Sequence, residues 1–204
     1  MSIYFILTVT GAYLLGAIPF GLLLSRAITK RDPRDHGSGN IGATNAMRTG
    51  GKLVGILTLV ADIAKSMIPV ALAVAMELSE TWIGAIAAAS FVGHIFPIYL
   101  KFKGGKGVAT MLGAMLPWQP LASLLGMLIW IVLMWATRYV SLASIAGALA
   151  LPLLVWMTGG SLPALLVSML FASLVTAKHA SNIRRLLDGT ELAMGKSQKT
   201  GSDA

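Results

Sequence analysis

Long apolar segments follow one another through most of this 204-residue sequence. About 20 residues of helix cross the hydrocarbon core of a bilayer, where the backbone must satisfy its own hydrogen bonds. With 56% hydrophobic and 12% charged residues, the composition lies outside the range of soluble domains. Hydropathy predicts seven segments, at residues 3–25, 53–76, 82–100, 107–117, 119–136, 139–158 and 161–177. We therefore expect an all-α integral membrane protein with seven transmembrane helices.

The segment 107–117 is the shortest of the seven, and Pro117 and Pro120 bracket the turn that follows it. It is short for a full crossing. Three arrangements remain open for it: a tilted crossing, a helix that starts deep within the protein, or a re-entrant half helix.

The distribution of positive charge predicts the orientation of the helices. With seven crossings, all sixteen Lys and Arg residues except Lys65 fall on one side, whereas the opposite loops contain Glu77 and Glu80 and no cation. Because cytoplasmic loops carry the excess of Lys and Arg, we expect the N-terminus outside, with no cleaved signal peptide, and the C-terminus in the cytoplasm. The chain then forms one membrane domain, residues 1–191, and a polar cytoplasmic tail, residues 192–204.

The net charge of +8 fits loops that face anionic lipids and anionic substrates better than it fits nucleic acid, because the sequence has no soluble basic helices. There is no cysteine, which excludes a thiolate nucleophile and a thiolate metal site.

A glycine-rich loop lies between two apolar segments, at residues 102–110. Three glycines (Gly104, Gly105 and Gly107) free the backbone to turn its N–H groups toward an anion, and Lys106 adds a positive charge. A helix that starts just after the loop would direct its positive end to the same anion. A basic loop on lipid headgroups is the simpler interpretation, but three glycines around one lysine favour phosphate binding.

This loop is not a nucleotide-binding Walker loop. Leu100 stands in the place of its first glycine, and Gly107 in the place of the Ser or Thr that would bind magnesium. Nucleotide hydrolysis is therefore disfavoured.

The segment 38–45, Ser-Gly-Asn-Ile-Gly-Ala-Thr-Asn, offers amides and hydroxyls with little bulk, and Arg48 follows it. Such a segment suits an oxyanion or a polyol. An ordinary turn in which Thr44 or Asn45 caps the next helix explains it as well, and taken alone the segment favours this structural interpretation.

Two more polar groups fall on the same predicted side. Ser141 and Ser144 share a helix face, and His179, Asn182 and Arg185 are spaced by three along the chain that leaves the last segment. Serines in membrane helices often bond their own backbone, and basic amphipathic tails often rest on headgroups. The structural interpretation is therefore favoured for the serines, and it competes with a functional one for the second group.

Asp62 and Lys65 are the charges predicted inside a span, three residues apart on one helix face. A structural ion pair is the favoured interpretation, and proton handling is the second. His94, also within a span, is expected to be a packing histidine.

Three motifs in this order carry a family resemblance: Ser-Gly-Asn-x-Gly-Ala-Thr-Asn, Gly-His-x-x-Pro before Phe-Lys-Gly-Gly-Lys-Gly-Val-Ala-Thr, and His-x-x-Asn-Ile-x-Arg-Leu-x-x-Gly-x-Glu. Over residues 1 to about 191, the sequence resembles the bacterial acyl-phosphate-dependent glycerol-3-phosphate acyltransferases (PlsY). The resemblance implies an enzyme of the bacterial cytoplasmic membrane with its active site on the cytoplasmic face. It implies transfer of a fatty acyl group from acyl phosphate to the 1-hydroxyl of sn-glycerol 3-phosphate. The products would be lysophosphatidic acid and phosphate, in the first step of phospholipid synthesis.

The resemblance also implies the site. It assigns catalytic roles to Lys106, Arg48, Ser38, His179 and Asn182, and substrate binding to Thr44, Asn45, Gly104, Gly105, Gly107 and Ser144. The implied partners are acyl phosphate, glycerol 3-phosphate and membrane lipid. No cofactor, no metal and no nucleic acid are implied.

Direct attack of a glycerol hydroxyl on the acyl carbon fits this site, because phosphate is a good leaving group and no covalent nucleophile is needed. The His-x4-Asp pair of other acyltransferases is absent, since the residues five places after the three histidines are Ile41, Tyr99 and Arg184. The proton acceptor stays open between His179 and a substrate phosphate oxygen.

Two other classes of function use a similar anion site. A transporter or flippase of phosphorylated lipids is disfavoured because the sequence shows no repeated halves. A membrane phosphatase is disfavoured because carboxylates are too sparse for a metal cluster.

Overall fold

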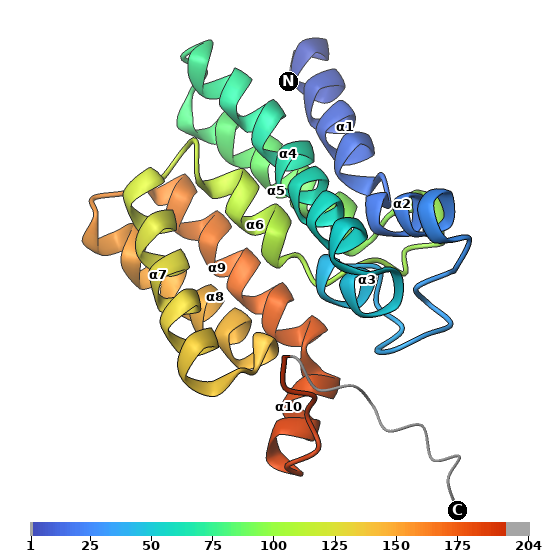
Figure 1. Cartoon of the computed structure of the whole chain (residues 1–204). Helices are drawn as coiled ribbons and strands as arrows, with labels where there is room; N and C mark the ends of the chain where they lie inside the picture. Colours follow the sequence, from blue (N-terminus) through green and yellow to red (C-terminus); the bar gives the residue numbers. More distant parts are fainter. Residues whose placement is uncertain (1, 195–204) are drawn as a thin grey trace, which may run out of the picture.

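The computed structural model describes residues 2–194, and every regular element in that range is a helix (Figure 1). The elements are α1 (Ile3–Ala17), α2 (Phe20–Thr29), α3 (Ala43–Gly50), α4 (Lys52–Ala75), α5 (Glu80–Ile95), the 3-10 turn η1 (Ile98–Leu100), α6 (Val108–Met115), α7 (Pro120–Thr137), α8 (Val140–Met157), α9 (Leu162–Lys178) and α10 (Ala180–Leu187). The expected all-α class is confirmed. Most of the predicted tail, residues 195–204, lies outside the described residues.

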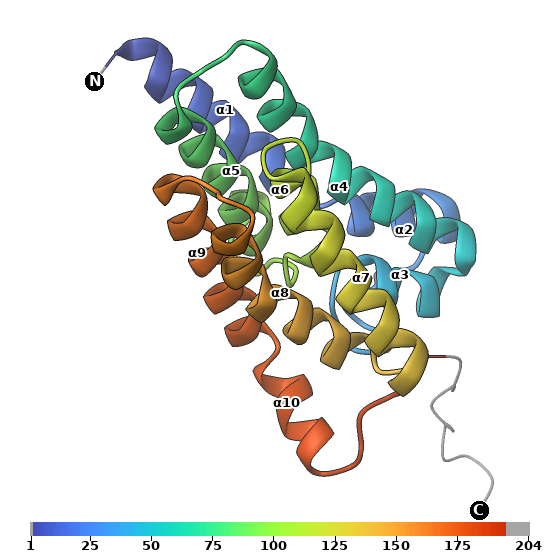
Figure 2. The same ribbon diagram turned by 90° about the vertical axis from the view of Figure 1, so that its left-hand side faces the viewer.

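Seven of the helices run side by side as a bundle, while α2, α3 and α10 gather at the end away from the N-terminus (Figures 1 and 2). At the other end, Trp118 Nε1 and the hydroxyl of Ser161 both donate to Glu80 Oε2, at 2.8 and 2.6 Å. These bonds tie together the turns that precede α5, α7 and α9. The two ends of the bundle therefore differ: one is closed by short turns, and the other carries the extra helices.

Within the described residues, five helical segments are long and apolar enough to cross a membrane, and a sixth results if α9 and α10, bent by 58°, count as one. The five are Ile3–Thr29, Lys52–Ala75, Glu80–Leu100, Pro120–Thr137 and Val140–Met157. The length and apolar composition of these helices are those of an integral membrane protein. The predicted count of seven is not reached by this criterion, because α6 has eight residues and α9, taken alone, has 17.

α6 is short because it starts inside the bundle. Gly107, which precedes it, has a positive φ of 87°, and a Cβ there would lie 2.5 Å from the ring of Phe91 in α5. The preceding loop also turns inward, since the N–H of Gly105 donates to the carbonyl of His94 at 3.1 Å. Of the three arrangements left open by the sequence, the structure shows the helix that starts deep within the protein (Figure 2).

The first apolar segment falls within the candidate span Ile3–Thr29, as predicted, but its helix is broken, because Ile18 takes an extended conformation and Pro19, which lacks an N–H, separates α1 from α2. One local expectation was wrong. The predicted loop 26–52 contains α3, whose N-cap is Gly42, so neither Thr44 nor Asn45 serves as the cap.

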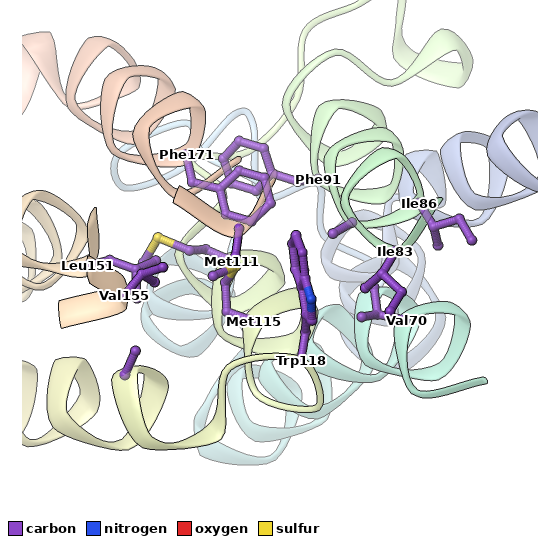
Figure 3. Close-up of a cluster of buried hydrophobic side chains, with 14 of the residues drawn as sticks. Val70, Ile83, Ile86, Phe91, Met111, Met115, Trp118, Leu151, Val155 and Phe171 are labelled. Atoms are coloured by element: carbon purple, nitrogen blue, oxygen red, sulfur yellow. The ribbon is translucent and has the colours of Figure 1, made fainter. Parts of the chain in front are cut away.

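The apolar core lies between α4, α5, α6, α8 and α9 (Figure 3). Phe91 and Phe171 are fully buried, and their ring centroids are 4.1 Å apart. Met111 and Met115 fill the space around them from α6. This packing fixes α6 and hence the loop that leads into it.

Candidate active site

A cavity of about 460 Å³ opens at the end of the bundle that carries α3 and α10. One part of its wall is polar, and we call it the polar chamber: Ser38, Thr44, Arg48, Lys106, His179, Asn182 and Glu191. The other part, which we call the apolar slot, lies between α4, α6, α7 and α8 and is lined mainly by Met111, Met115, Met127, Ile131 and Leu151. The same cavity thus joins a charged compartment to a hydrocarbon-like one.

Lys106 and Asn182 form the centre of the polar chamber. Lys106 comes from the loop before α6, Asn182 from α10, and the lysine Nζ donates to the amide Oδ1. His179 lies one helical turn before Asn182, at the bend between α9 and α10, as the spacing by three predicted. The structure therefore brings together the second and third sequence motifs, which lie more than 70 residues apart.

Glu191 anchors this centre, although the sequence-based assignment left it out. Its Oε1 accepts from Ser141 Oγ at 2.7 Å and from Asn182 Nδ2 at 2.6 Å, and its Oε2 accepts from Arg185 Nε at 2.7 Å. The carboxylate thus holds the amide that holds Lys106. The signal was present in the sequence as the final glutamate of the third motif, and Ser141 had been interpreted as structural.

The first motif supplies a wall of the chamber. The amide of Asn45 is within bonding distance of three backbone carbonyls, those of Pro33, His36 and Asn40, and its Oδ1 accepts from the N–H of Ser38 at 2.9 Å. Asn45 therefore shapes the loop, while its contact with substrate stays a prediction. Ser38, Thr44 and Asn45 line the cavity.

Arg48 also lines the chamber and reaches the last described segment of the chain. Its Nη2 donates to the carbonyl of Leu192 at 3.2 Å. The N–H of Met194 in turn donates to the carbonyl of Arg138 at 2.8 Å. Residues 191–194 therefore pass along the mouth of the cavity, from α10 to the turn between α7 and α8.

The three glycines of the loop have different surroundings. Gly107 lines the cavity, whereas Gly104 and Gly105 pack against α5 behind Lys106 and are not among the lining residues. A Cβ on Gly105 would lie 2.1 Å from His94 Nε2, and one on Gly104 would lie 2.1 Å from the His94 carbonyl oxygen. Close packing explains why these two positions are glycines, and their contact with substrate stays a prediction.

Two helix N-termini point into the chamber. The residues that begin α3 (Ala43 and Thr44) and α6 (Val108 and Ala109) line the cavity. The first N–H groups of a helix have no acceptor within it, and they favour a negatively charged ligand. Together with Lys106 and Arg48 they form a site suited to more than one anionic group.

Ser144 and Trp130 lie where the chamber meets the apolar slot. Ser144 Oγ donates to the carbonyl of Val140 at 2.7 Å and accepts from Trp130 Nε1 at 3.1 Å. The serine therefore bonds its own helix, as the structural interpretation expected, and also orients an aromatic wall of the slot.

The ionisable groups of the chamber are shifted by its partial burial. Burial lowers the pKa of Lys106 to about 8; Glu191 opposes this shift, and the charges of Arg185 and Arg48 add to it. Burial also lowers the pKa of His179 to about 4, against the opposing effect of its hydrogen bond to the Val175 carbonyl. At neutral pH the chamber thus offers a cationic lysine and a neutral histidine.

The charges predicted inside a span do form an ion pair. Lys65 Nζ lies 2.8 Å from Asp62 Oδ1, and both side chains are buried. The pair also includes His94, whose Nδ1 is 2.9 Å from the same Nζ. Asp62 and His94 border the cavity beside the glycine loop.

The family model for glycerol-3-phosphate acyltransferases matches residues 6–189. The chain belongs to the glycerol-3-phosphate acyltransferase family. The glycerol-3-phosphate acyltransferase of Syntrophotalea carbinolica is 49% identical over 189 residues, which cover 92% of this chain and 96% of that protein. The corresponding protein of Geotalea daltonii is 48% identical, with 91% and 95% covered.

Two crystal structures of PlsY (YgiH), described as an integral membrane glycerol 3-phosphate acyltransferase, share the fold of this family member. The glycerol 3-phosphate form aligns with a TM-score of 0.90 and the lysophosphatidic acid form with 0.87, each at 36% identity over 94% of this chain and 96% of the other. The resemblance seen in the sequence is thereby confirmed at the level of the family.

Proposed function

We propose that this acyltransferase moves a fatty acyl group from acyl phosphate to the 1-hydroxyl of sn-glycerol 3-phosphate and releases lysophosphatidic acid and phosphate. The observation that carries the proposal is the single cavity that joins a polar chamber with two cations to an apolar slot. Both substrates carry a phosphate, and one carries a fatty chain. The related crystal structures are described as glycerol 3-phosphate and lysophosphatidic acid forms, which fits this substrate and product pair.

The acyl chain would occupy the apolar slot. The lining residues of α8 run from Val140 to Leu151, which corresponds to a depth of about 16 Å at 1.5 Å per residue. Gly126 and Gly147 line this space where α7 and α8 come close together, since a Cβ on Gly147 would lie 3.4 Å from the carbonyl oxygen of Gly126. A fatty chain would thus leave water while its reactive end stays in the chamber.

Lys106 and Arg48 would neutralise the two phosphates with the N-termini of α3 and α6, with Ser38, Thr44 and Gly107 as further contacts. The glycerol hydroxyl oxygen then attacks the acyl carbon, the bond from that carbon to the phosphate oxygen breaks, and phosphate leaves with the electron pair. The increase in rate comes from aligning the two anionic substrates and from stabilising the charge on the leaving phosphate. A covalent intermediate on the protein is not required.

The hydroxyl proton would pass to a phosphate oxygen of a substrate. His179 is a poor alternative, because its Nδ1 lies 2.8 Å from the Val175 carbonyl and must carry a hydrogen there, and its pKa is lowered to about 4. A base with such a pKa binds the proton weakly at neutral pH. His179 would instead orient a substrate through Nε2, while Asn182 holds Lys106.

We place the chamber at the cytoplasmic face of a bacterial cytoplasmic membrane. The loops and short helices at the chamber's end carry the described Lys and Arg residues apart from Lys65, and the opposite turns carry Glu77 and Glu80. This is the charge asymmetry expected of cytoplasmic loops. It also fits a site for phosphorylated cytoplasmic substrates at the start of phospholipid synthesis.

The proposal is tested with the purified protein in detergent, palmitoyl phosphate and glycerol 3-phosphate. Phosphate release that requires both substrates, with formation of lysophosphatidic acid, supports it. Palmitoyl-CoA with glycerol 3-phosphate tests the donor in parallel. Turnover with the thioester and none with acyl phosphate would contradict the proposed donor, and binding of glycerol 3-phosphate without any turnover would contradict the reaction.

A further inference from the structure

A buried polar cluster lies behind the glycine loop, where two of its members also border the cavity. It consists of Asp62 and Lys65 on α4 and His94 on α5, which are 2%, 2% and 5% exposed. Lys65 Nζ lies 2.8 Å from Asp62 Oδ1, 2.9 Å from His94 Nδ1 and 2.9 Å from the carbonyl oxygen of Ile18. Three buried charged or polar groups in such surroundings are costly unless they satisfy one another.

The three contacts of Lys65 determine how His94 is held. An ammonium group has three N–H donors and no acceptor, and here each of its contacts is an oxygen or nitrogen acceptor. His94 Nδ1 therefore accepts, and the ring hydrogen is on Nε2. Because Ile18 lies between α1 and α2, the same ammonium group also joins those helices to α4 and α5. The ammonium group that contacts the imidazole is thus held on three sides.

The imidazole of His94 is the surface on which the glycine loop rests. The N–H of Gly105 donates to the His94 carbonyl at 3.1 Å, and Gly105 is so close to the ring that a Cβ would lie 2.1 Å from Nε2. Gly104 packs against the backbone of His94, since a Cβ on Gly104 would lie 2.1 Å from the His94 carbonyl oxygen. Lys106 is the next residue in the chain, so the place of its Cα depends on this contact.

We propose that Asp62, Lys65 and His94 are positioning residues that set the place of Lys106 in the polar chamber. Asp62 and Lys65 hold the imidazole, the imidazole supports Gly105, and Gly105 holds the backbone from which the Lys106 side chain starts. The inference rests on the proposed function, because Lys106 is taken to act on the phosphates. It also explains why two glycines are needed at places that face the protein and not the cavity.

The decisive variant removes both charges together. Lys65→Met alone would leave Asp62 as an unpaired buried charge, whereas Asp62→Leu with Lys65→Met replaces the ion pair by apolar groups of similar size, a change that is often tolerated. The matched control is Thr58→Val, which removes another fully buried polar group one turn earlier in α4, where the hydroxyl donates to its own helix. Each protein is compared for thermal midpoint, kcat and KM for glycerol 3-phosphate.

We expect the double variant to fold and to lose about 10- to 100-fold in kcat/KM, because small displacements of a catalytic group have effects of that size. Thr58→Val should stay within twofold of the wild type. In a second pair, His94→Asn can still accept from Lys65, whereas His94→Leu cannot. We expect the asparagine variant to keep several times more activity than the leucine variant at equal thermal midpoint.

Equal kcat and KM in the double variant and the wild type would overturn the inference. If the double variant does not fold, the His94 pair decides, and equal activities of the asparagine and leucine variants overturn it. Failure of the proposed function has a different signature, since the wild-type protein itself would then release no phosphate from the two substrates.

Discussion

Lys65 and Lys106 are both withdrawn from water, but they differ in how the protein satisfies them. Lys65 forms an ion pair with Asp62, and its ammonium group also contacts His94 Nδ1 and the carbonyl oxygen of Ile18. Lys106 has one side-chain acceptor within residues 2–194, the Oδ1 of Asn182, and lines a cavity. The ammonium group of Lys65 is thus held by the protein on three sides, whereas Lys106 belongs to an open cluster in which it has donors left for a ligand. The comparison separates a structural lysine from one suited to bind phosphate.

Replacing Lys106 by Ala should have the largest effect on activity. We expect kcat/KM to fall by about 1,000-fold or more, because a preorganised cation that stabilises developing charge is lost. The thermal midpoint should change little, since no buried partner charge is left behind. Steady-state phosphate release measures the first quantity, and unfolding in detergent measures the second.

Lys103→Ala is the control for this change, because Lys103 is an exposed lysine of the same loop. Its activity should stay within about twofold of the wild type, as expected for a screened surface charge. Equal losses in the Lys103 and Lys106 variants would mean that the loop acts through its general charge and not through one positioned ammonium group.

Lys65→Met should differ from Lys106→Ala in having a large effect on stability. Removal of one partner from a buried ion pair costs about 3–5 kcal/mol, because Asp62 would remain as an uncompensated charge. Thermal unfolding should show a clear drop of the midpoint, and Asp62→Leu in the same chain should restore much of it. A Lys106→Ala protein less stable than the Lys65→Met protein would reverse the comparison between the two lysines.

Glu191→Gln tests the support of the open cluster. The change keeps one oxygen acceptor but removes the charge that holds Ser141, Asn182 and Arg185 together. Burial raises the pKa of Glu191, but these hydrogen bonds outweigh it and leave the pKa below its ordinary value, so the group is a carboxylate at neutral pH. We expect kcat/KM to fall by about tenfold or somewhat more, in line with losing a charge-assisted hydrogen bond.

The exposed Asp188, three residues earlier, provides the control for Glu191. Asp188→Asn removes the same charge from the same segment without touching Asn182, and it should leave the rate within about twofold. If the two variants behave alike, the carboxylate does not act through the lysine.

The smallest effect is the pH dependence of the wild-type enzyme. The pKa of Lys106 is lowered to about 8, so the cation is present below that pH and is lost as the pH rises through it. We expect kcat/KM to fall above pH 8, approaching a tenfold decrease per pH unit, while kcat declines at higher pH because bound phosphates favour the charged amine. Initial rates between pH 6 and 10, measured over a range of substrate concentrations, give the pH dependence of both kcat/KM and kcat. A kcat/KM that stays constant to pH 9.5 would be inconsistent with an essential ammonium group of this pKa.

The sequence alone determined the membrane class, because long apolar segments exclude a soluble fold and leave helices as the means of satisfying the backbone. It also determined the family, since three motifs with fixed internal spacing appear in one order. Through the family resemblance it also predicted that Lys106, His179 and Asn182 belong to one site. The motifs themselves depend on residues close together in the sequence.

Only the tertiary structure revealed the features that depend on contacts between residues far apart in the sequence. It showed that α6 starts inside the bundle, that Glu191 anchors Asn182, and that Asn45 shapes a loop. It also divided the glycines by their surroundings, since Gly104 and Gly105 meet His94 across a gap of about ten residues in the chain while Gly107 faces the cavity. A glycine in a sequence indicates that a side chain is excluded, but only packing determines whether a ligand or another helix excludes it.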